Sequence, residues 1–87
     1  MDEATTVKYV IEALEGVGAD DVRAVTRYVA GFGPRTIEVV LLDAGPLFPK
    51  RYEARATDEV GKMVSSGACA TITGALGTVP WKDLLLH

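Results

Sequence analysis

Two neighbouring segments with strand-like patterns constrain the fold of this chain more than any other feature. Residues 36–42 (TIEVVLL) form a nearly continuous apolar run rich in β-branched side chains, which is typical of a central strand. Residues 51–56 (RYEARA) alternate strictly, as on a strand with one buried face. The loop between them contains two prolines, so the pattern predicts an antiparallel hairpin. We expect Tyr52, Ala54 and Ala56 to face inward and Arg51, Glu53 and Arg55 to face solvent.

Residues 22–30 (VRAVTRYVA) fit two different structures. Asp20 and Asp21 before the segment, with Gly31 and Pro34 after it, favour a helix. Its β-branched and aromatic side chains favour a strand. Because an isolated two-stranded hairpin is only marginally stable, a third strand would complete the sheet, and we expect a strand here.

Helices are predicted on both sides of this meander. Residues 4–15 carry an apolar stripe at helical spacing, formed by Val7, Val10, Ile11 and Leu14. We expect this helix to pack against Tyr52 and Ala54. Thr57 suits the N-cap of a second helix, whose buried stripe would be Val60, Met63 and Val64. Residues 68–73 fit either a fourth strand or a continuation of that helix, and Pro80 suits the start of a short C-terminal helix over 81–86.

The predicted fold class is therefore α+β, in a single domain spanning 1–87. It comprises an N-terminal helix, a three-stranded antiparallel meander, a helix, a segment that could be a fourth strand, and a short C-terminal helix. This order of elements resembles that of double-stranded-RNA-binding domains from Thr5 to about Leu76. That family carries a lysine-rich N-terminus on its last helix, whereas the matching residues 58–63 (DEVGKM) are acidic with one lysine.

Composition argues against several kinds of chemistry. Cys69 is the only cysteine and His87 the only histidine, so neither a disulfide nor a histidine-rich metal site is expected. The nearest residues to Cys69 are alanines, which is typical of a buried structural thiol. We predict no catalytic residues, no metal and no cofactor. The acidic N-terminus and the lack of a long apolar run predict a cytoplasmic protein with no membrane partner.

Arginines form one candidate binding surface. On the predicted strands, Arg23 and Arg27 share a face, and so do Arg51 and Arg55. Such a face could bind an anion or a nucleic acid. The net charge of −3 and the interspersed acids instead favour a solvated face with cross-strand ion pairs, so we expect nucleic-acid binding to be weak.

Surplus apolar residues form the other candidate surface. Hydrophobic residues make up 48% of a chain of 87 residues, and so small a domain has little interior in which to hide them. The expected interface residues are Leu47, Phe48, Trp81, Leu84 and Leu85. The leading hypothesis is a small non-enzymatic module that associates with itself, as a homodimer or larger, and acts through protein contacts. The alternative is a nucleic-acid or anion-binding domain that uses the arginine face.

Overall fold

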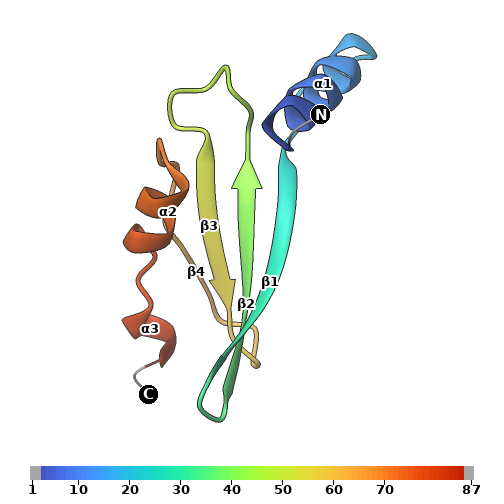
Figure 1. Cartoon of the computed structure of the whole chain (residues 1–87). Coiled ribbons are helices and arrows are strands. Elements are labelled where there is room, and N and C mark those ends of the chain that lie inside the picture. The colour runs from blue at the N-terminus through green and yellow to red at the C-terminus, as the bar shows by residue number, and fades with distance from the viewer. Residues whose placement is uncertain (1–2, 86–87) are drawn as a thin grey trace.

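The computed structural model describes residues 3–85, which form a four-stranded antiparallel meander with helices before and after it (Figure 1). The strands lie in the order β1-β2-β3-β4. The elements are α1 (Glu3–Gly16), β1 (Ala24–Phe32), β2 (Arg35–Asp43), β3 (Tyr52–Thr57), β4 (Met63–Ser65), α2 (Ile72–Thr78) and α3 (Lys82–Leu85). The α+β class, the N-terminal helix and the strand at 22–30 are confirmed.

The register of the central strands follows from the sequence pattern. Val39 on β2 pairs with Ala56 on β3, and Leu41 pairs with Ala54. Both alanines are fully buried, as the alternation predicts. β1 and β2 are joined by the two-residue turn Gly33–Pro34, and Gly33 has a φ of 62°, which suits the first position of a tight hairpin turn.

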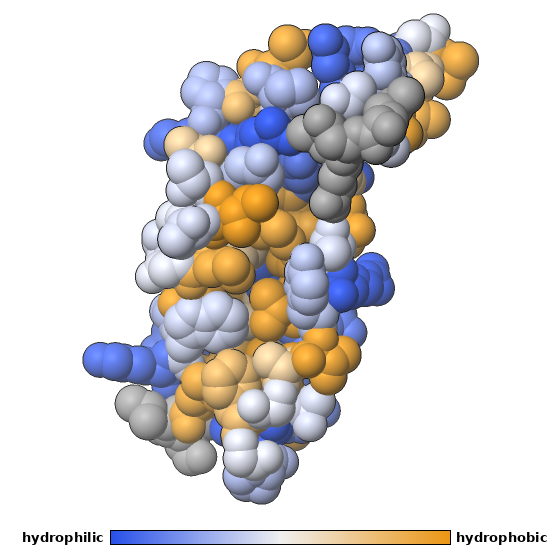
Figure 2. All heavy atoms as spheres, in the orientation of Figure 1, coloured by the Kyte–Doolittle hydropathy of each residue, from blue (hydrophilic) through white to orange (hydrophobic). Residues whose placement is uncertain are grey.

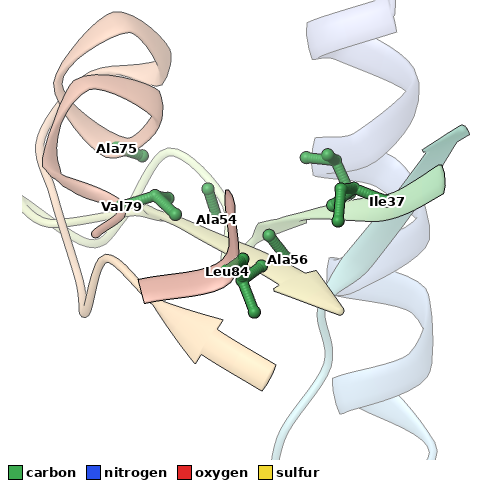
Figure 3. Close-up of a cluster of buried hydrophobic side chains, with 7 residues drawn as sticks. Ile37, Ala54, Ala56, Ala75, Val79 and Leu84 are labelled. Carbon is green, nitrogen blue, oxygen red and sulfur yellow. The ribbon is translucent and has the colours of Figure 1, made fainter. Parts of the chain in front are cut away.

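The core lies on one face of β2 and β3, where α2 and α3 pack (Figure 3). We had expected α1 to cover Tyr52 and Ala54, and this expectation is wrong. The small side chains of Ala54 and Ala56 instead lie beneath Ala75, Val79 and Leu84 of the C-terminal segment. The buried cluster consists of Ile37, Val39, Ala54, Ala56, Ala75, Val79 and Leu84.

The helix predicted after Thr57 is absent from the described chain. Instead, the Asp58 carboxylate accepts hydrogen bonds from the backbone N–H groups of Val60 and Lys62, at 3.1 and 2.9 Å. Gly61 has a φ of 88°, which helical residues do not adopt. The chain therefore turns back at once and forms β4, and the resemblance to the RNA-binding order ends at β3.

Residues 68–73 adopt neither of the two structures considered for them. Cys69 forms an isolated bridge with Tyr52, with backbone hydrogen bonds of 2.7 and 2.9 Å. Thr71 then caps α2, because its side-chain oxygen accepts a hydrogen bond from the N–H of Gly74. The short C-terminal helix predicted after Pro80 is present as α3, from Lys82 to Leu85.

α1 lies beyond the end of the sheet and does not cover either of its faces (Figure 1). Of its apolar stripe only Ile11 is buried, while Val10 and Leu14 are 49% and 43% exposed. Ile11 contacts the loop after β2 so closely that a Cβ on Gly45 would lie 2.7 Å from its Cδ1 atom. The stripe that the sequence marks as buried is therefore mostly uncovered.

Candidate protein-interaction surface

Side chains of the types considered for metal binding do not gather into a candidate site in the described part of the chain. Among residues 3–85 there is no group of three or more histidine, cysteine, aspartate or glutamate side chains that could hold a metal ion. Cys69 is half-buried and its Sγ atom lies 3.7 Å from the carbonyl oxygen of Gly67. His87 lies outside the described residues. Within the described part of the chain, no helix has the length and apolar character needed to cross a bilayer.

Arg51, predicted as part of an anion-binding face, is held by an acid. Its guanidinium donates two hydrogen bonds of 2.8 Å to the Asp43 carboxylate and lies 4.8 Å from the centre of the Tyr52 ring. Partial burial acts to raise the pKa of Asp43. The net effect is a lowered pKa, because the carboxylate accepts hydrogen bonds from Arg51 and from the N–H of Gly45 and lies beside the positive charge of Arg51. Arg51 therefore ties the two ends of the β2–β3 loop together.

Arg23 and Arg55 lie on one sheet face and share Glu53. The Nε atom of Arg55 lies 2.6 Å from this carboxylate, and Arg23 approaches it to 4.0 Å. The hydrogen bond from Arg55, supported by one from Ser65, lowers the pKa of Glu53. Arg23 also lies 3.4 Å from Asp21. These ion pairs reduce the positive potential that an anion would meet here.

Arg27 differs from the other three arginines of the predicted face. It is exposed on β1, and no ion pair involving it is found among the described residues. Glu38, exposed on the same face of β2, likewise has no ion pair within this part of the chain. The structure therefore brings Arg23 and Arg55 together around an acid and leaves one cation and one anion free on this face.

The predicted interface residues fall into two groups. Leu47 and Phe48 are 82% and 58% exposed in the loop after β2, where they line a shallow pocket with Ile11 of α1. Leu84 is fully buried, while Trp81 and Leu85 are half-buried against the core. The indole N–H of Trp81 donates a 3.0 Å hydrogen bond to the carbonyl of Leu76. Leu84 therefore belongs to the interior of its own chain and is not available to a partner.

The outer edge of β1 is a surface that sequence reasoning missed. β1 is nine residues long, and no other segment within residues 3–85 pairs with its outer edge (Figure 1). Its exposed apolar side chains are Val25 (48%), Tyr28 (56%), Val29 (75%) and Phe32 (41%). The predicted meander places this strand at an edge, but the sequence pattern did not show that its apolar side chains would stay exposed on both faces.

The molecule exposes more surface than a compact monomer of its mass. Its accessible surface is 5773 Å² for a mass of 9.3 kDa, where a typical monomer exposes about 5000 Å². Its radius of gyration is 14.6 Å, compared with about 12 Å for a compact domain of this length. Figure 2 shows hydrophobic side chains at the surface over the middle of the molecule and at the end that carries α1.

Comparison with known proteins adds no relative. The sequence matches no protein-family model, and no curated protein or solved structure is detectably similar to it.

Proposed function

We propose that this chain is a non-enzymatic module that associates with itself and acts through protein–protein contacts. The observation that carries the proposal is the surplus of exposed surface. The excess over a compact monomer is about 800 Å², which is the area that each partner contributes to an interface of standard size.

The distribution of exposed apolar side chains supports the same function. Many of the exposed large apolar side chains of the described residues lie on α1, in the β2–β3 loop and along β1. Large apolar side chains that gather at the surface of a soluble protein often mark a binding site. Among the described residues, in contrast, the large side chains that are fully buried are those of Ile37 and Leu84.

Light scattering on the purified chain tests this proposal. We expect the mass to rise to a dimer or higher as the protein concentration increases from micromolar to millimolar, with little dependence on salt. A folded monomer throughout this range contradicts the proposal. Weak association that salt abolishes would instead point to charge pairing as its main cause.

A further inference from the structure

We propose that the partner in this self-association is a second copy bound along the open edge of β1, with the two β1 strands antiparallel and the sheet continuous across both copies. This inference rests on the proposed function, because it names the surface through which the chain associates. It commits to one occupant and to one alignment of the two strands.

The edge of β1 has little of the protection usual for an edge strand, since Arg27 is the one charged residue among 24–32. Natural proteins shield edge strands by keeping them short or by placing prolines, bulges or inward-pointing charges along them. β1 is long, contains no proline and pairs with β2 without interruption from Ala24 to Phe32. The opposite edge is shielded, because β4 has only three residues. Only the β1 edge therefore offers a long ladder to another strand among the described elements.

The open edge of β1 presents a regular row of backbone N–H and C=O groups. Phe32 and Arg35 flank the two-residue turn and so form a hydrogen-bonded pair. Because such pairs alternate along an antiparallel ladder, every second residue of β1 points its N–H and C=O groups away from β2. The outward-pointing residues are Val25, Arg27, Val29 and Gly31. Two full-length strands paired through them would exchange about eight hydrogen bonds.

Symmetry then fixes the alignment. A twofold axis perpendicular to the sheet keeps each face of one copy continuous with the same face of the other, and full overlap of residues 24–32 places the axis beside Tyr28. Tyr28 of one copy lies opposite the partner subunit's Tyr28, which is a favourable cross-strand aromatic pair. Arg27 lies opposite the partner's Val29, so like charges do not meet.

Charge complementarity favours this alignment. Val29 pairs with Glu38 on β2, so the partner's Arg27 falls in the same row and on the same face as Glu38, with Val29 between them and a backbone separation of about 10 Å. A long arginine side chain can reach over a valine to that carboxylate. Each copy would therefore pair the free cation of one chain with the free anion of the other, and the contact occurs twice by symmetry.

The shape of the surface at the ends of the two β1 strands also favours this alignment. The alignment places Phe32 of each copy opposite the partner's Ala24. Ala24 and Val22 line an open apolar groove against Val10 and Leu14 of α1. Phe32 is 41% exposed in the single chain and would lie at the mouth of that groove in the dimer. The uncovered stripe of α1 would thus gain an apolar neighbour.

Cysteine cross-linking tests the alignment. In a Cys69→Ser background, Tyr28→Cys places two thiols opposite each other across the axis, with Cα atoms about 4.5 Å apart, which suits a disulfide. Val29→Cys is the matched control, because Val29 is more exposed than Tyr28 but faces the partner's Arg27. We expect Tyr28→Cys to form a covalent dimer under mild oxidation at least about tenfold faster than Val29→Cys. Equal or faster cross-linking of the control overturns the proposal.

A charge exchange tests the same surface without thiols. Arg27→Glu should weaken dimerisation about tenfold, because it places two acids in one row, and adding Glu38→Arg should restore it. Light scattering measures the dissociation constants, and circular dichroism confirms that each variant is folded. If the wild-type chain dimerises and neither variant changes the dissociation constant, the β1 edge is not the interface although self-association stands. If the wild-type chain is monomeric, both proposals fail.

Discussion

Replacing Asp58 should destabilise the chain more than any other single change in its turns. The Oδ1 atom of Asp58 accepts two backbone hydrogen bonds across the β3–β4 turn, and Oδ2 lies 3.5 Å from the guanidinium of Arg35. The Asp58 side chain is only 2% exposed. Hydrogen bonds to a charged group contribute about 1.5–3 kcal/mol each, but water can reach the exposed turn and replace part of them. We expect Asp58→Ala to cost about 2–4 kcal/mol.

Asp58→Asn is the matched control, because its amide oxygen can still accept both backbone hydrogen bonds while the charge is lost. We expect it to cost about 1 kcal/mol. Urea unfolding, followed by the fluorescence of Trp81 at one fixed protein concentration, measures both free energies. If Asp58 merely preceded a helix, its replacement would cost about 0.3–1 kcal/mol through the helix dipole. A cost below about 1 kcal/mol for the alanine variant would therefore refute the role assigned to this turn.

Three further outcomes follow from the packing and the ion pairs. Leu84→Ala should lower the free energy of unfolding by about 2–5 kcal/mol and Leu47→Ala by less than about 0.5 kcal/mol, because of these two residues only Leu84 is buried. Similar costs for the two variants in urea unfolding would contradict the packing of α3 in the core. Gly45→Ala should cost at least about 1–2 kcal/mol of folding free energy, because the residue has a φ of 99°. The added Cβ would also press on Ile11, so amide hydrogen exchange in α1 should become faster, and unchanged exchange would contradict the contact between α1 and this loop. Glu53 has a lowered pKa, so its stabilising contribution is present above its ordinary pKa of 4.5 and is lost as pH falls through the folded-state pKa. The urea midpoint of the wild-type chain should therefore fall between about pH 6 and 3, and Glu53→Gln should make this fall smaller.

The sequence was sufficient to predict the meander but not what covers it. Alternation in residues 51–56 identified the buried face of β3 correctly, because a one-residue shift would expose both alanines. The partner of that face was wrong for a physical reason. α1 carries an apolar stripe, yet residues of the C-terminal segment after β4 cover Ala54 and Ala56. Helical periodicity identifies the apolar face of a helix, but it does not identify the surface against which that face packs.

The helix predicted after Thr57 failed through competition between two local structures. Asp58 can stabilise a helix start, but its side chain can equally accept backbone hydrogen bonds in a turn. Gly61 decides between them, because it takes a positive φ at no steric cost. The predicted meander already places its first strand at an edge of the sheet, but the pattern did not show that α1 would leave the edge of β1 uncovered.

The composition of the core connects stability to the proposed assembly. Three of its seven buried residues are alanines, namely Ala54, Ala56 and Ala75, and they let α2 lie close to β3 but bury little apolar area each. The larger apolar side chains of β1 and α1 remain at the surface. A single chain therefore gains less from burial than its hydrophobic content allows, and pairing along β1 would recover part of that difference. In such a molecule folding and association are linked, because a partner that binds only the folded state stabilises it by an amount that rises with the logarithm of the protein concentration.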